Sequence, residues 1–124
     1  MSAADRLVPL DTGALTPEQV RLVMNELQLD LTFVDEHNVI RYYSEHFRVF
    51  ERTPEDIGTD VVACHSPGTR SRVERLLSEL ASGWRDSAEF LEKKGERLVD
   101  VRYVALRDEA GAYRGCLEIA SWAE

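Results

Sequence analysis

The sequence predicts a single α+β domain, and three patterns support this fold class. Residues 97–107 and 113–122 are runs of strand-forming residues separated by a short turn containing Gly111, which is typical of a long β-hairpin. A second hairpin is predicted over residues 30–44, and an amphipathic helix over residues 71–81. The length of 124 residues suits one compact core.

Both faces of the long hairpin carry apolar side chains. One face of its first strand is formed by Val99, Val101, Tyr103 and Ala105. The other face mixes Leu98, Val104 and Leu106 with charged residues. Since an antiparallel sheet with one solvated face has a clean alternation of apolar and polar residues, we expect this sheet to be covered on both sides.

Composition and charge exclude several functional classes. Hydrophobic residues make up 44% and charged residues 31% of the chain, as in ordinary globular domains. The net charge of −8 argues against nucleic acid or an anionic membrane as a partner. No apolar run reaches transmembrane length, and the N-terminus lacks the pattern of a signal peptide. Cys64 and Cys116 form no CxxC pair, which favours two reduced thiols in a cytoplasmic protein.

The N-terminal part is predicted to hold one helix. Residues 1–15 read as an irregular leader, and Thr16 and Gln19 can form a capping box around Pro17. The helix is predicted to continue to Leu29. Its apolar stripe consists of Val20, Val23, Met24 and Leu27. This stripe can be buried against the outer face of the sheet or against a second subunit.

The middle of the chain is predicted to contain short helical segments. These segments are residues 46–50, 53–58 and 60–65. Ser66-Pro67-Gly68 is expected to break the last of them before the helix at residues 71–81. A further strand is predicted at residues 87–93.

The order of these elements resembles that of a PAS domain, and three segments carry the resemblance. Residues 30–35 followed by 39–44 resemble the opening hairpin of that family. Arg52-Thr-Pro-Glu-Asp-Ile-Gly58 resembles the short helical segment that ends in glycine, and residues 107–115 resemble the turn between the last two strands. The resemblance spans roughly residues 29–122.

This resemblance implies a PAS fold with a five-stranded antiparallel sheet in the order 2-1-5-4-3. The helices from residues 45 to 82 are then expected to cover one face of the sheet, and the helix ahead of the first strand is an addition. The implied domain organisation is an N-terminal leader and dimerisation helix at residues 1–29, followed by the PAS domain at residues 30–124.

Within the PAS family, the chain is most similar to the C-terminal PAS domain of bacterial proteins that begin with a hemerythrin-like domain. The matching segments are Asp30–Asp35, Arg52–Pro54, Cys64–His65, Ser82–Gly83, Ala88–Phe90 and Val101–Tyr103. Three departures are evident: the hemerythrin-like part is missing, Ser66-Pro67 stands in place of Pro-Pro, and Ser121-Trp122-Ala123 replaces the Asp-Ile-Thr signature. We therefore expect a stand-alone module with no kinase, cyclase or DNA-binding output of its own.

Cys64-His65 is the most informative pair for chemistry. One interpretation is that His65 faces the PAS pocket, where a neutral imidazole can bind haem iron or hold a polar ligand. The other is that His65 caps a helix end by bonding to the backbone. A zinc site is disfavoured, because adjacent side chains point apart and two more ligands would have to come from His37, His46 or Cys116.

Further residues are candidates for the wall of a binding pocket. The complete predicted cofactor-binding set is His65, Cys64, Tyr43, Phe90, Arg102 and Tyr103, with His65 as the metal ligand. Arg102 also has an alternative role. Together with Asp100, Glu89 and Glu118, it can form cross-strand ion pairs instead of reaching a carboxylate or a haem propionate.

Two functions compete at this point. The first is a sensory module that binds a small molecule, with haem as one candidate, and signals to a separate protein. The second is a ligand-free interaction or dimerisation domain. Either is expected to form a homodimer, as PAS domains with a flanking helix often do. No phosphate-binding loop, nucleophile elbow or HExxH motif indicates an enzyme.

Overall fold

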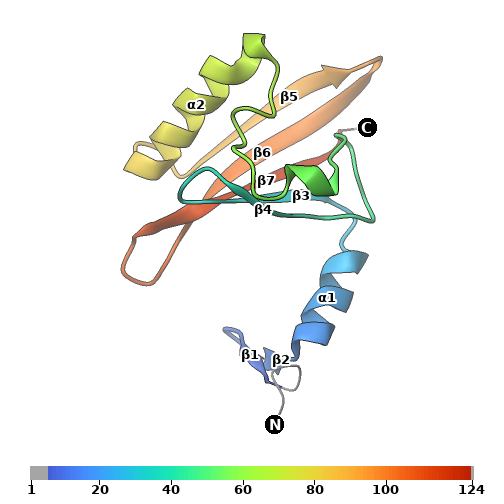
Figure 1. The fold of residues 1–124 in the computed structure, drawn as a ribbon, viewed down its shortest axis with the longest axis vertical. Helices are drawn as coiled ribbons and strands as arrows, with labels where there is room; N and C mark the ends of the chain where they lie inside the picture. The colour runs from blue at the N-terminus through green and yellow to red at the C-terminus, as the bar shows by residue number, and fades with distance from the viewer. Residues whose placement is uncertain (1–5, 124) are drawn as a thin grey trace.

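A five-stranded antiparallel sheet forms the centre of the computed structural model, which describes residues 6–123 (Figure 1). Its strands are β3 (Asp30–Asp35), β4 (Ile40–Tyr43), β5 (Ser87–Lys94), β6 (Arg97–Arg107) and β7 (Tyr113–Trp122). The spatial order is β4-β3-β7-β6-β5. This is the 2-1-5-4-3 order implied by the sequence, so the predicted fold is confirmed.

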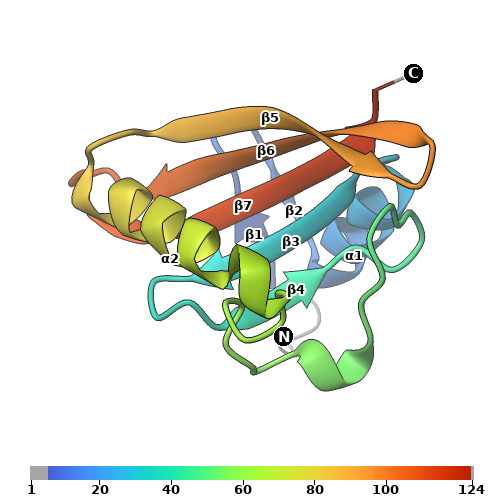
Figure 2. The ribbon, with the colours of Figure 1, turned by 90° about the horizontal axis from the view of Figure 1, so that it is seen from above.

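The long hairpin has the predicted bounds and fixes the two faces of the sheet. Val101 pairs with Ala120, Tyr103 with Glu118, and Ala105 with Cys116. Because paired residues of antiparallel strands point to the same side, these six share the inner face, which is the one covered by α2 (Pro67–Ser82; Figure 2). The core therefore lies between this face and α2.

Helix α2 starts earlier than the sequence suggested. Ser66 occupies the N-cap and Pro67 the first helical position, where the missing N–H of proline has no cost. The Ser66-Pro67-Gly68 segment is thus the start of the helix rather than a break before it. Gly83 ends the helix in a left-handed conformation with φ 85°. The predicted apolar stripe is buried, and its members are Val73, Leu76, Leu77 and Leu80.

Two of the predicted short helices are absent, while the third is the 3₁₀ turn η2 (Pro54–Asp56). Residues 46–50 form bends, because the Asp30 carboxylate accepts hydrogen bonds from the backbone of this segment. Residues 60–65 form consecutive turns. The first begins at Asp60, whose carboxylate accepts a hydrogen bond from the Val62 N–H at 2.8 Å. Side-chain bonds to nearby N–H groups replace helical bonds in both places.

The N-terminal segment stands apart from the sheet (Figure 1). Strands β1 (Val8–Pro9) and β2 (Ala14–Leu15) form a small hairpin where a leader without regular structure was predicted; residues 1–5 of that leader lie outside the described part. Helix α1 (Pro17–Glu26) has the predicted capping box but ends before Leu29. It buries none of its residues. No helix among residues 6–123 is long and apolar enough to cross a membrane.

The hairpin turn between β3 and β4 is organised by one carboxylate. Asp35 accepts hydrogen bonds from the N–H groups of His37 at 2.8 Å and Val39 at 3.1 Å, and from Arg41 Nε at 2.8 Å. Burial opposes ionisation of Asp35, but the bonds from Arg41, Val39 and His37 outweigh it and lower the pKa of this carboxyl.

The turn between β6 and β7 repeats this arrangement at the same spacing. Asp108 accepts from the N–H groups of Ala110 and Ala112 and from Arg114 Nε, at 2.9, 3.0 and 2.9 Å. The hydrogen bond from Ala112, followed by that from Arg114, lowers the pKa of Asp108. Both hairpin turns therefore have the same design: an aspartate accepts hydrogen bonds from the residues two, four and six positions later.

These lowered pKa values predict acid sensitivity. A carboxyl whose pKa is lower in the folded state stabilises the fold above its unfolded pKa, and this stabilisation is lost as the pH falls through the folded pKa. The unfolding free energy should therefore decrease between about pH 5 and pH 2. Urea unfolding at both pH values should find a smaller decrease in Asp35→Asn than in the wild type. An identical decrease in both proteins would contradict the role given to Asp35.

Candidate functional site

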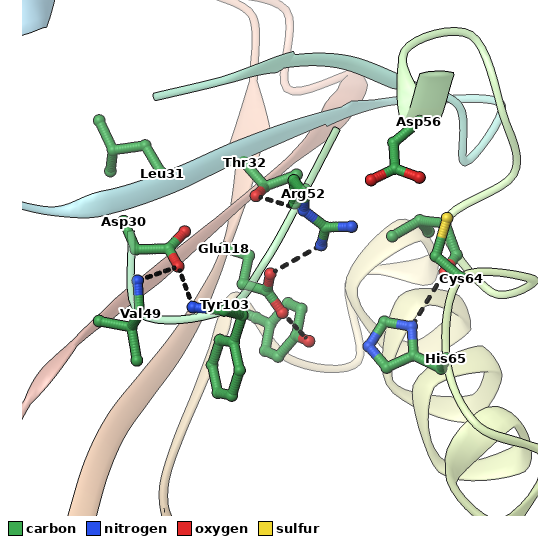
Figure 3. Close-up of polar contacts among 12 residues, drawn as sticks. Asp30, Leu31, Thr32, Val49, Arg52, Asp56, Cys64, His65, Tyr103 and Glu118 are labelled. Carbon is green, nitrogen blue, oxygen red and sulfur yellow. Dashed lines mark hydrogen bonds and ion pairs between the residues drawn. The ribbon is translucent and has the colours of Figure 1, made fainter. Parts of the chain in front are cut away.

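Four polar side chains meet on the inner face and are called here the inner polar cluster: Thr32, Arg52, Tyr103 and Glu118 (Figure 3). Thr32 pairs with Glu118 across β3 and β7, and Glu118 pairs with Tyr103 across β7 and β6. The strand register therefore places three of them side by side. Arg52 comes from the segment between β4 and η2 and reaches over the sheet.

Every member of the inner polar cluster has a partner. Arg52 donates from Nη2 to Glu118 Oε1 at 3.2 Å and from Nε to Thr32 Oγ1 at 3.1 Å. The Tyr103 hydroxyl donates to the second carboxylate oxygen of Glu118. The side chains of Arg52 and Glu118 are each 9% exposed. Because a buried carboxylate is tolerated only with compensating donors, this pairing is what allows Glu118 to lie inside.

The Tyr103 hydroxyl is held in its protonated form. Burial raises the pKa of Tyr103, and the negative charge of Glu118 raises it further. Tyr103 is therefore a permanent donor to Glu118 at physiological pH. The phenol of Tyr103 can therefore donate a hydrogen bond, but it does not release its proton easily.

A second buried carboxylate, Asp30, attaches the loop after β4 to the sheet. Asp30 is 1% exposed and accepts from the N–H groups of Val49 at 3.0 Å and Phe50 at 2.9 Å. It also forms an ion pair with Arg48 at 2.7 Å. The guanidinium of Arg48 lies over the ring of Tyr43, 5.3 Å from its centre. This arrangement positions the segment that carries Arg52.

The structure brings only some of the predicted site residues together. Phe90 and Tyr103 stack on the inner face with ring centres 6.0 Å apart. Tyr43 lies on β4, at the opposite edge of the sheet from β5. Arg102 is exposed and points to the outer face, because it neighbours Tyr103 on the same strand. Arg102 therefore cannot line an interior pocket together with Tyr103.

His65 combines features of both sequence interpretations. Its Nδ1 donates to the backbone carbonyl of Val61 at 2.9 Å, which is a local structural role. Figure 3 shows its ring extending from residues 60–66 toward the side of Tyr103 and Glu118. Among the described residues, no hydrogen bond joins His65 to the inner polar cluster.

Replacement of His65 by alanine should lower stability modestly. The variant loses one partly buried hydrogen bond, for which a decrease of about 1 kcal/mol in unfolding free energy is expected. Chemical denaturation measures this change, with the exposed His37→Ala as the matched control. A loss far above that value would mean that His65 supports more of the interior than the Val61 contact.

The two cysteines occupy different environments. Cys64 is exposed, with its Sγ 3.5 Å from Thr59 Oγ1. Cys116 is fully buried, and burial raises the pKa of its thiol to about 12, so it stays protonated and unreactive. No group of three or more His, Cys, Asp or Glu side chains within residues 6–123 could hold a metal ion.

Two surface hollows lie away from the predicted interior pocket. One, of about 450 Å³, lies between α1 and residues 46–47, and its lining includes Leu22, Leu27 and Phe47. The other, of about 280 Å³, lies between α2 and β5 and includes Phe90. Neither lining includes His65 or Tyr103.

Sequence reasoning missed Arg52 as a site residue, although one signal was available. Glu118 shares its face of the strand with Cys116 and Ala120, which are both fully buried. A carboxylate at such a position requires a cationic or hydrogen-bonding partner. The sequence alone could not identify that partner, because Arg52 lies 66 residues away.

Comparisons with known proteins agree with this architecture. A family model described as "PAS domain" matches residues 20–121. The C-terminal domain of a Streptococcus mutans protein is 31% identical with a TM-score of 0.89, and the match covers 98% of this chain and 95% of that one. The comparison with curated proteins gave no match.

Two further solved structures share the fold at low identity. A sensory box sensor histidine kinase from Vibrio cholerae is 13% identical with a TM-score of 0.62, covering 86% of this chain and 90% of that one. The PAS domain of Bordetella pertussis BvgS is also 13% identical, with a TM-score of 0.66 and coverages of 86% and 85%. The likeness to hemerythrin-linked PAS domains stays a prediction. With a family model matching most of its length, this chain belongs to the PAS domain family.

Proposed function

We propose that this chain is a PAS sensory module that acts through protein–protein contacts, and that it forms a homodimer through α1 and the outer face of the sheet. The observation that carries the proposal is the unburied helix α1. Leu22, Val23 and Leu27 are 50, 52 and 40% exposed. An amphipathic helix usually gains its stability by burying its apolar face, so α1 needs a partner surface.

The outer face of the sheet offers a second unburied apolar surface. The partly exposed apolar side chains on this face include Phe33, Val104, Leu117 and Ile119. They neighbour one another through the pairing of β3, β7 and β6. Of the two covered faces that the sequence predicts, the inner one is covered by α2. We propose that a second copy of the chain supplies the cover of the outer face.

The Streptococcus mutans domain supports a structural role for the N-terminal segment. Its match covers 98% of this chain, so it includes α1 together with the sheet. A helix that shares the arrangement of a related domain is part of the fold rather than an incidental extension. A second copy is favoured as the occupant because α1 and the outer face can cover each other reciprocally around a two-fold axis.

Val23→Glu should dissociate the dimer. Light scattering coupled to gel filtration is expected to find twice the chain mass of 14.1 kDa for the wild type and the single-chain mass for the variant, because the new carboxylate cannot be buried unpaired. Arg21→Glu places the same side chain on the opposite side of α1 and should leave the dimer intact. A monomeric wild type at micromolar concentration would refute the dimer proposal.

The interior of the protein supports a haem site less well than the exposed surfaces support an interaction function. Because Nδ1 of His65 donates to the Val61 carbonyl, Nε2 of the neutral ring has a free lone pair, as a metal ligand requires. Val101, Tyr103 and Leu80 belong to the buried core between the sheet and α2, and each is at most 5% exposed. Among the predicted site residues, only Phe90 lines one of the two hollows. We therefore propose the interaction function over a haem sensor, and expect a visible spectrum of purified protein without a Soret band.

A further inference from the structure

Helix α2 and the edge strand β5 enclose a hollow of about 280 Å³, called here the arginine groove. Its lining consists of Arg72, Arg75, Leu76, Glu79, Trp84, Arg85, Ala88 and Phe90. Leu76, Ala88 and Phe90 provide an apolar floor. The charged side chains and Trp84 form the rim.

The rim carries three guanidinium groups and a single carboxylate, in a chain whose net charge is −8. Arg75 is 82% exposed, and its only carboxylate neighbour among the described residues is Glu79 at 3.9 Å. Arg72 is paired with Glu92 at 3.2 Å and lies 5.5 Å over the ring of Phe90. With Glu92 counted, the groove has three guanidinium groups and two carboxylates. This local excess of one positive charge on an acidic protein favours an anion.

Arg85 has a loosely paired donor at this site. Its Nε atom is buried and makes no hydrogen bond to any of residues 6–123, although Glu79 Oε1 lies 3.4 Å away. The ion pair with Glu79 thus compensates this buried N–H incompletely. The Arg85 side chain as a whole is 37% exposed, so an acceptor in the groove can approach its guanidinium. A carboxylate placed between Arg75 and Arg85 would supply such an acceptor.

Trp84 is the second notable feature of the groove. It is 70% exposed, the highest value among the exposed large apolar residues of the described part of the chain. The Arg85 guanidinium lies 4.9 Å from its ring centre. An exposed indole beside an apolar floor can stack on a flat ring, as aromatic side chains do in ligand sites.

We propose that the arginine groove binds a small aromatic carboxylate. The ring lies against Trp84 and the apolar floor, and the carboxylate accepts from Arg75 and Arg85. The volume is just below the roughly 300–1,000 Å³ of typical small-molecule sites, so a single substituted ring is the appropriate size. This site is separate from α1 and from the interior around His65, so its test is independent of the proposed dimer.

Trp84 itself can report binding. In a Trp122→Phe background it is the sole tryptophan, and titration with benzoate and phenylacetate should give a saturable change in its fluorescence. Acetate supplies the charge without a ring, and benzamide supplies the ring without the charge. Both should bind about tenfold or more weakly.

Arginine variants then locate the site. Arg75→Met and Arg85→Met should each weaken benzoate binding by about tenfold or more, whereas Arg114→Met, which removes a charge at the β6–β7 turn, should not. Because the Arg75 side chain is largely exposed, its variant is expected to fold normally, and circular dichroism checks this. Added salt should weaken binding in the wild type.

Three results would overturn the proposal. The first is the absence of a saturable signal with either aromatic acid. The second is equal affinity for acetate, phosphate and benzoate, which would indicate a general anion patch. The third is binding of a short acidic peptide containing phenylalanine when benzoate does not bind, which would make the groove a protein-docking surface instead.

Discussion

Arg52→Met is expected to destabilise the fold by about 3–5 kcal/mol, because it leaves Glu118 buried without its cation. Glu118 keeps the Tyr103 hydroxyl as a donor, but a single neutral donor cannot replace a guanidinium. Thr32 also loses the bond from Arg52 Nε. Urea unfolding monitored by circular dichroism measures the change. Arg21→Met, which breaks an exposed ion pair with Glu18, should leave the midpoint unchanged.

A double variant distinguishes a broken ion pair from simple loss of packing. Arg52→Met combined with Glu118→Leu removes both charges, and replacing a buried pair by apolar residues is often neutral. We expect the double variant to be more stable than Arg52→Met alone. If it is less stable, Arg52 acts mainly through its packing and its bond to Thr32. A loss below 1 kcal/mol in Arg52→Met would contradict a buried pair.

The sheet could be predicted from the sequence because its determinants are local. The alternation in residues 97–107 and 113–122 and the turn between them fixed the bounds of β6 and β7 without knowledge of the rest of the chain. The helical spacing of Val73, Leu76, Leu77 and Leu80 likewise predicted the buried side of α2. In each of these elements the spacing of apolar residues marks the face that is buried, so the pattern can be read from the sequence alone.

The candidate site could not be predicted in the same way, because its contacts are distant in sequence. Asp30 accepts from backbone groups 19 and 20 residues later, and this contact prevents the predicted helix at residues 46–50. The sequence predicts Arg102 and Tyr103 together as pocket residues, yet adjacent residues of a strand point to opposite faces, so the two side chains lie apart. Composition identifies charged residues in strands, but only the register shows which of them face inward.

Gly115→Ala is the second substitution with a large expected effect. Gly115 has φ 128° and pairs with Asp35 on one side and Leu106 on the other, beside the irregularity between Leu106 and Arg107. A Cβ atom here would overlap the carbonyl oxygen of Val34 and lie 2.9 Å from the Cα of Asp35. Both neighbours are backbone of the central sheet, so neither can move without breaking the pairing of β3 and β7.

Gly111→Ala is the matched control, because it separates backbone conformation from steric overlap. Gly111 also has a positive φ, of 84°, but a Cβ atom there would meet nothing within 4 Å. We expect Gly111→Ala to cost about 1–2 kcal/mol from conformation alone, and Gly115→Ala roughly 4 kcal/mol or more because the overlap is added. Thermal and urea unfolding measure both. Equal losses of unfolding free energy in the two variants would mean that β3 shifts to accept the methyl group. The β3–β7 pairing would then be more deformable than its position at the centre of the sheet implies.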